Sequence, residues 1–111
     1  MYYTYLLRCG DGSLYAGITT DPARRLAEHR SGGKKGARYT RFRAPCSMVA
    51  VWESGDRSRA AKLEARLKKT KHEVKERLVQ EPERLEELLP VPEGVYRVAA
   101  DAANDAGVKD A

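Results

Sequence analysis

The chain has 111 residues, of which 33% are charged, and a formal net charge of +5 at pH 7. This length fits one domain with a tail, and the two cysteines and the lack of an apolar run near 18 residues argue against a disulfide scaffold, a zinc site or a membrane span. The charge is uneven: residues 1–90 hold 19 Lys and Arg against 12 Asp and Glu, whereas residues 91–111 hold two against four. A basic body of this kind suggests a polyanionic partner, and solubility is the plainer alternative that composition leaves open.

The first two predicted elements form a β-hairpin. Residues 2–9 (YYTYLLRC) are aromatic and apolar, as in a buried strand, and residues 14–19 (LYAGIT) form its partner. The GDGS sequence between them is typical of a tight turn, because glycine and aspartate tolerate positive φ.

A helix follows the hairpin. Asp21 is placed to accept hydrogen bonds from the first backbone N–H groups, Pro22 fits the first helical position, and the glycines at 32–33 end the helix. Arg25 and His29 are four residues apart, so they share one face of this helix.

The next segments alternate between loop, strand and helix. Residues 34–45 form a basic loop, and residues 46–54 (CSMVAVWES) form a third strand. A second helix, capped by Asp56 or Ser58, carries Glu64 at the edge of its buried stripe. Residues 72–79 continue as helix or form a separate one, and residues 82–89 form another short helix.

These elements predict an α+β fold in which a small three-stranded antiparallel sheet is flanked by helices, in the order β-β-α-β-α-α. We expect one domain at residues 1–90 and a flexible tail at residues 91–111, with a short strand in GVYRVAA as the alternative for part of that tail. Cys9 and Cys46 are interpreted as reduced core thiols, with disulfide pairing as the alternative. We expect a soluble, cytoplasmic protein.

The segment 24–43 is the first candidate for function. It carries eight Lys and Arg in twenty residues, interleaved with aromatic residues. Such a surface can neutralise several phosphates and stack on a base, whereas the plainer alternative is a solvated loop with Phe42 in the core. The nucleic-acid-binding candidates are Arg24, Lys34, Lys35, Arg38, Tyr39, Arg41 and Arg43.

A second group of candidates could carry chemistry, although each member also has a simple explanation. Tyr5 and Tyr15 can converge on the hairpin, but strand tyrosines mostly pack. Glu64 is able to hold a hard divalent ion, but it can equally pair with Lys68 on the next helical turn. His29 can be a packed core histidine, and no HExxH, GxSxG, Walker or GxGxxG motif is present.

Together these residues resemble the GIY-YIG nuclease domain, most closely the short stand-alone bacterial members of that superfamily. The resemblance rests on the order and spacing of YTY (3–5), LYAG (14–17), RRLAEH (24–29) and KLEARLKK (62–69), and it covers residues 2–80. It implies a metal-dependent endonuclease acting on DNA, of the kind used in DNA repair or recombination. The site residues that match the family pattern are Tyr5, Tyr15, Gly17, Arg25, His29 and Glu64.

The resemblance also implies roles for these residues. Glu64 would hold one Mg²⁺ or Mn²⁺, either tyrosine would orient or deprotonate the attacking water, and Arg25 would stabilise phosphate charge and lower a phenol pKa. His29 would orient Tyr5 or relay a proton. The expected partner is DNA, branched or single-stranded, with no membrane, no small-molecule cofactor and a monomeric protein.

Three departures from the family pattern are visible. Tyr3 and Thr4 replace Gly and Ile of the first motif, Ala16 replaces Ile of the second, and the asparagine that many larger members place after the glutamate helix has no counterpart. The accessory DNA-binding domain of larger members is also missing from this sequence. Two alternatives therefore stay open: a nucleic-acid-binding module with little cleavage, and an adaptor that docks partners on residues 71–89.

Overall fold

In the computed structural model, residues 1–31, 46–91 and 94–99 are described. The elements are β1 (Tyr2–Arg8), β2 (Leu14–Thr19), α1 (Pro22–Ser31), β3 (Ser47–Ser54), α3 (Arg57–Lys69), α4 (His72–Gln80), the 3₁₀ helix η1 (Pro82–Arg84), α5 (Leu85–Leu88) and β4 (Arg97–Val98). The predicted α+β class and the order of the first six elements are therefore confirmed. No helix of the described ranges is long and apolar enough to cross a bilayer.

The sheet is antiparallel throughout and has the strand order β2-β1-β3-β4. It has four strands, so the expectation of three is wrong. The additional strand is β4, which pairs with β3 through Trp52↔Val98 and Glu53↔Arg97. Its two residues are too few to show a period-two pattern, and the strand alternative for GVYRVAA is the correct one. The division into a domain and a tail at residue 90 stays a prediction, and residues 100–111 lie outside the described part.

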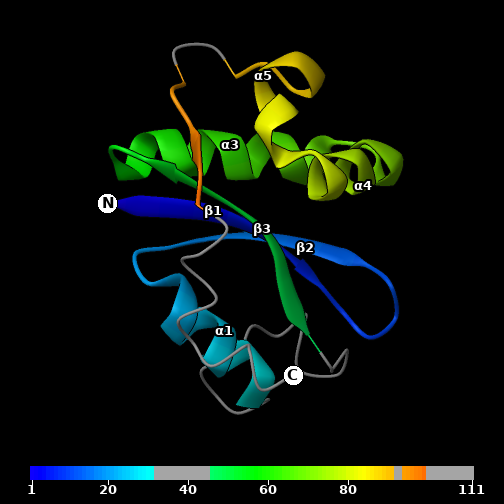
Figure 1. The fold of residues 1–111 in the computed structure, drawn as a ribbon. Helices are drawn as coiled ribbons and strands as arrows, with labels where there is room; N and C mark the ends of the chain where they lie inside the picture. Colours follow the sequence, from blue (N-terminus) through cyan, green and yellow to red (C-terminus); the bar gives the residue numbers. More distant parts are fainter. Residues whose placement is uncertain (32–45, 92–93, 100–111) are drawn as a thin grey trace.

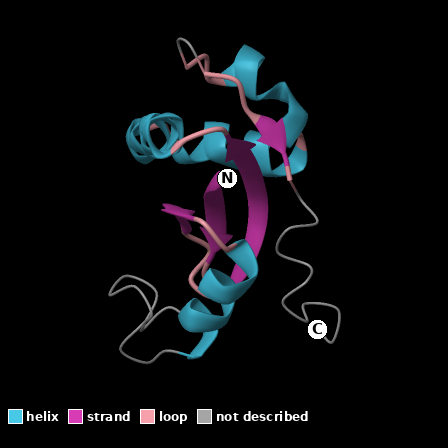
Figure 2. Cartoon of the chain, turned by 90° about the vertical axis from the view of Figure 1, so that its left-hand side faces the viewer, coloured by secondary structure: helices cyan, strands magenta, loops and turns pink. Residues whose placement is uncertain are grey.

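Helices cover both faces of the sheet (Figure 1). The α3, α4 and α5 helices lie on one face, and α1 lies on the other, as the side view in Figure 2 also shows. Because side chains alternate along a strand, neighbours on β1 enter different cores. Leu6 packs with Leu63 and Leu67 of α3, whereas Tyr5 and Leu7 pack with Leu26 of α1.

Local signals fix the helix starts where the sequence predicts them. Asp21 Oδ1 accepts a hydrogen bond from the Arg24 backbone N–H at 3.1 Å, and Asp56 Oδ1 accepts one from the Arg59 N–H at 2.8 Å. Each of these bonds satisfies a donor that the first helical turn leaves unpaired. In the hairpin turn, Gly12 has a φ of +86°, which glycine adopts without steric cost.

The helices at the end of the domain cover the sheet. Leu78, Leu85 and Leu89 are buried in the same core as Trp52, whose indole N–H donates to the Pro82 carbonyl at 2.9 Å. These contacts support the plainer interpretation of residues 71–89, in which they pack on the sheet. The two cysteines are also as expected: both are free and buried, with their sulfur atoms 3.9 Å apart.

Candidate active site

Three aromatic side chains meet on the α1 face of the sheet, toward its β2 edge. The Tyr5 hydroxyl of β1 lies 2.9 Å from His29 Nε2 of α1, and both side chains are almost completely buried. The His29 ring also makes edge-to-face contacts with Tyr5 and Tyr15, at centroid distances of 5.8 and 5.7 Å. Tyr15 on β2 is only half-buried, so it is the tyrosine of the cluster that a large substrate can reach.

Gly17 makes room for this arrangement. It lies opposite Tyr5 in the β1–β2 register, and a Cβ atom at Gly17 would lie 2.5 Å from the Tyr5 hydroxyl oxygen. That distance is far inside van der Waals contact, so only glycine leaves room for the phenol at this position. The glycine in the middle of a strand thus has a packing reason.

Arg25 joins the cluster from the same face of α1 as His29, as their spacing predicts. Its guanidinium is within hydrogen-bonding reach of the Tyr5 phenol and forms an ion pair with Glu28 at 2.9 Å. Its side chain is 23% exposed, so it can touch both the buried phenol and a ligand at the surface. Glu28 has no place among the predicted site residues, although its i,i+3 spacing from Arg25 was the available signal.

Burial dominates the protonation of this cluster. It raises the pKa of Tyr5 to about 12, because the opposing effect of Arg25 is smaller and the charges of Tyr15 and Glu64 also raise it. Arg25 does lower the pKa of Tyr5, as expected, but burial outweighs this effect, so the net pKa of the phenol is raised. Burial, together with the positive charge of Arg25, lowers the pKa of His29 to about 4, so the imidazole is neutral at pH 7.

Glu64 reaches the cluster from the other layer. It lies on α3, which packs against β1 and β2, and its charge acts on the Tyr5 phenol. Lys68 Nζ lies 3.5 Å from the Glu64 carboxylate, which is the simple helical pair expected from the spacing. Glu64 therefore pairs along its helix and also lies near enough to Tyr5 for its charge to raise the pKa of the phenol.

The structure brings together Tyr5, Tyr15, Arg25 and His29, and Glu64 lies near enough to Tyr5 for its charge to act on the phenol. Arg24 lies next to Arg25 on α1 and its side chain is 61% exposed. The other predicted nucleic-acid contacts, Lys34, Lys35, Arg38, Tyr39, Arg41 and Arg43, lie outside the described residues. Sequence reasoning also missed Thr4, whose buried hydroxyl donates to the Ala60 carbonyl at 2.9 Å and ties β1 to the helix that carries Glu64.

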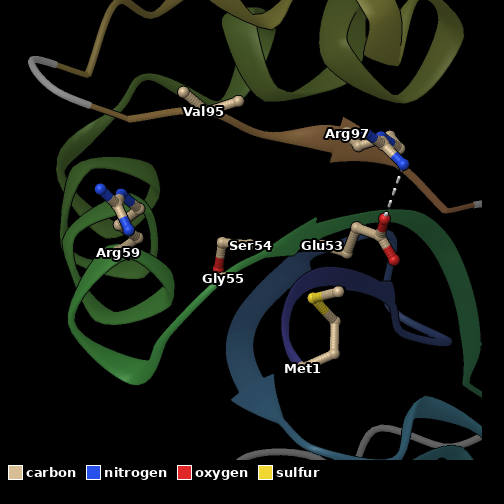
Figure 3. Close-up of a pocket in the computed structure, with 7 residues that line it drawn as sticks. All are labelled: Met1, Glu53, Ser54, Gly55, Arg59, Val95 and Arg97. Carbon is tan, nitrogen blue, oxygen red and sulfur yellow. Dashed lines mark ion pairs between the residues drawn. The ribbon is translucent and has the colours of Figure 1, made fainter.

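A separate pocket of about 340 Å³ opens at another part of the sheet (Figure 3). It lies between the end of β3, the start of α3 and β4, and none of the clustered residues lines it. Its two arginines already have acidic partners, since Arg97 lies 3.7 Å from Glu53 and Arg59 lies 2.9 Å from Asp56. The charges of this pocket are therefore balanced, which makes it a poor phosphate site.

A small antiparallel sheet with helices on both faces, and a Tyr, Arg, His and Glu cluster at one edge, defines a nuclease-type domain. The family model described as the GIY-YIG catalytic domain matches residues 1–77 of the chain. A UPF0213 protein from Yersinia pestis (strain Pestoides F) is 48% identical over 85 residues, which span 77% of this chain and 87% of the relative. A UPF0213 protein from Yersinia pseudotuberculosis (serotype I, strain IP32953) matches to the same extent.

A solved structure has the same fold. The solution NMR structure of the protein EF2693 from E. faecalis aligns with a TM-score of 0.51 and 43% identity, over 74% of this chain and 85% of that one. This chain belongs to the GIY-YIG family, and its relatives are short stand-alone bacterial members. The resemblance noted in the sequence is therefore confirmed, and the family is one of nucleases that generally use divalent metal ions.

Proposed function

We propose that this protein is a metal-dependent endonuclease that hydrolyses phosphodiester bonds in DNA, with a role in DNA repair or recombination. The observation that carries the proposal is the hydrogen bond of 2.9 Å between the Tyr5 hydroxyl and His29, set between Arg25 and Glu64. A fold of this size does not need two buried polar rings, an arginine and a carboxylate converging beside one edge strand. Hydrolysis of a phosphodiester needs such groups, to place a water and to balance charge on phosphate oxygens.

Arg25 is the proposed phosphate-binding cation of the reaction. Its ion pair with Glu28 and its reach to Tyr5 hold the guanidinium at the mouth of the cluster, where it stays charged. A fixed cation at this position stabilises the negative charge that develops on the phosphate oxygens in the transition state. Removal of one such contact costs on the order of 10²–10³ in rate.

The two tyrosines have different environments and therefore different proposed roles. Tyr5 is 1% exposed and has a pKa of about 12, so at neutral pH the phenol keeps its proton and forms a hydrogen bond with Nε2 of the neutral His29 ring. We assign Tyr5 and His29 to positioning. Tyr15 packs on His29 and is half-buried, which supports the proposal that its hydroxyl contacts the attacking water.

Glu64 fits a divalent metal ion of the magnesium type. It offers a hard carboxylate oxygen beside a phenol, and Mg²⁺ in phosphoryl-transfer sites binds through only one or two carboxylates plus substrate phosphates. Within the described ranges, no group of three or more His, Cys, Asp or Glu side chains is placed to hold a metal. A Mg²⁺ or Mn²⁺ ion at Glu64 would supply Lewis-acid stabilisation of the leaving oxygen.

The proposal is tested by cleavage of labelled single-stranded, flapped and branched DNA with Mg²⁺ or Mn²⁺. Wild type is compared with Glu64→Gln and with Glu73→Gln, a matched control at an exposed position of α4. We expect Glu64→Gln to lose at least a hundredfold in rate and the control to stay within twofold of wild type. Equal rates in all three proteins would remove Glu64 from the reaction, and no cleavage by wild type would contradict the proposal.

A nucleic-acid-binding module with little cleavage is the second candidate. It is favoured by one observation: the Glu64 carboxylate forms an ion pair with Lys68, whose ammonium competes with a metal ion for the carboxylate. Salt-dependent DNA binding by a wild-type protein that cleaves none of the DNA substrates would identify this alternative.

A further inference from the structure

The helices α3, α4 and α5, which share one face of the sheet, differ strongly in charge (Figure 1). The α3 helix carries six Lys and Arg against one Glu, whereas residues 72–88 carry six Glu against three Lys and Arg. A polyanion is therefore attracted to α3 and repelled by the helices that follow it.

The side of α3 that carries Glu64 also carries two of these cations. Ala60, Leu63 and Leu67 are buried against the sheet, which fixes the orientation of the helix. Arg57, Glu64 and Lys68 recur at helical spacing and share one side of it, which we call the Glu64 flank. This flank lies near the tyrosine cluster, because α3 packs against β1 and β2, the strands that carry Tyr5 and Tyr15, and the charge of Glu64 acts on the Tyr5 phenol.

The opposite side of α3 lies toward β4, at the other edge of the sheet from β2. Arg59 and Arg66 are seven residues apart and share that side. The Arg59 carbonyl accepts a hydrogen bond from Tyr96, next to β4, at 2.7 Å. Arg66 is exposed and lies away from the Glu64 flank, so it provides a matched control of equal charge.

The spacing on the Glu64 flank suits a nucleic-acid strand. With a rise of 1.5 Å per residue, Lys68 lies about 6 Å beyond Glu64 along the axis and Arg57 about 10 Å before it. Lys68 is 55% exposed and contacts Glu64 at 3.5 Å, so its flexible ammonium can exchange that contact for a phosphate oxygen. Arg57 is exposed at the start of the helix, where N–H groups also favour an anion.

We propose that Lys68 and Arg57 bind the phosphates on either side of the scissile one, so that a single DNA strand runs along the Glu64 flank of α3. Arg24 is exposed on α1, on the other face of the sheet, and adds a further positive charge to the molecule. The proposal rests on the proposed function only for placing the scissile phosphate at Glu64. It predicts a second basic surface besides the segment 24–43.

The test is binding without cleavage. Anisotropy of a labelled single-stranded DNA is measured in EDTA over a series of salt concentrations, with Lys68→Gln, Arg57→Gln and the control Arg66→Gln. We expect each of the first two to weaken binding about three- to tenfold and to reduce the slope of log K against log salt by roughly 0.7, the value of one phosphate contact. The control should stay within twofold, and thermal melts verify that all variants are folded.

Equal losses in all three variants would show that only net charge matters, and no loss in Lys68→Gln and Arg57→Gln would place the strand elsewhere. Either result overturns the proposal that a DNA strand runs along the Glu64 flank. An RNA of the same sequence is the second arm, and tighter binding to it would overturn DNA as the strand. Cleavage by wild type is measured separately. If wild type cuts DNA but all variants bind DNA equally well, only the proposed path of the strand along the Glu64 flank is refuted, and the proposed function is not.

Discussion

Gly17 is the residue on which the geometry of the cluster depends most directly. Its missing side chain leaves the space that the Tyr5 phenol fills, and the nearest atoms to an added Cβ would be the phenol oxygen at 2.5 Å and its ring carbon at 2.6 Å. Moving Tyr5 away would cost free energy, because its hydroxyl is hydrogen-bonded to His29 and its ring is buried. Packing of the sheet and assembly of the site are therefore coupled at this position.

We predict that Gly17→Ala destabilises the fold by about 1–3 kcal/mol, the usual cost of overpacking, and lowers DNA cleavage more than tenfold. Urea denaturation and the cleavage assay measure the two effects. Gly55→Ala is the control, because its Cβ would meet only a flexible Arg59 terminus at 3.8 Å. A Gly17→Ala protein with the stability and activity of wild type would show that Tyr5 does not need its present position.

His29 gives the cluster a pH dependence whose sign follows from its pKa. The value of about 4 lies below the ordinary 6.5, mainly because burial disfavours the charged ring. The unfolded chain therefore binds a proton more readily, and folding stability is full above pH 6.5 and is lost as the pH falls toward 4. A difference of this size corresponds to about 3 kcal/mol for a fully buried group.

We predict that the free energy of unfolding of wild type falls more steeply between pH 6.5 and 4 than that of His29→Gln. Denaturant titrations at several pH values measure the difference, and carboxylates that titrate in both proteins cancel in the comparison. Arg66→Gln, at an exposed position of α3, serves as the control and should keep the wild-type slope. Parallel curves for wild type and His29→Gln would mean that the buried ring is not the source.

At the scale of elements, the sequence predicted most where a local signal was strong. The hairpin followed from apolar strands around a glycine turn, and the starts of α1 and α3 followed from Asp21 and Asp56, because one side chain there satisfies a helix donor. Residues 82–89 were predicted as one helix but form η1 and then α5. The Pro82 carbonyl accepts a hydrogen bond from the Trp52 indole N–H, and no local sequence pattern reveals this tertiary contact.

The candidate site was predictable for similar reasons and only in part. A spacing of four placed Arg25 and His29 on one face, and the hairpin placed Tyr5 and Tyr15 on neighbouring strands. That Glu64 belongs to the site came from the resemblance. Its approach from the other layer depends on how α3 packs on β1 and β2, which no local pattern reveals. The depth of Tyr5 is a property of the assembled core, so neither its raised pKa nor its bond to His29 follows from local pattern.

At the scale of the whole molecule, the chain after Pro90 returns to the sheet and adds to its β3 side. The Ala99 N–H donates to the Val51 carbonyl at 2.8 Å, and the Tyr96 hydroxyl donates to the Arg59 carbonyl at 2.7 Å. The second bond joins β4's segment to α3, the helix that carries Glu64. The last described segment thus supports the same layer that the proposed site uses, although it lies far from Tyr5 in sequence.

This arrangement predicts that the domain needs residues 94–99. A chain ending at Val91 loses both hydrogen bonds and the pairing of Trp52 with Val98, and since each bond contributes about 1 kcal/mol, we expect it to be about 2–3 kcal/mol less stable than wild type. A chain ending at Ala99 keeps all of these contacts and should unfold within about 0.5 kcal/mol of wild type. Urea denaturation followed by the fluorescence of Trp52, the single tryptophan, measures both. If the two truncated chains were equally stable, β4 would contribute nothing and the division predicted at residue 90 would stand. A loss only in the shorter chain would move the end of the domain to β4.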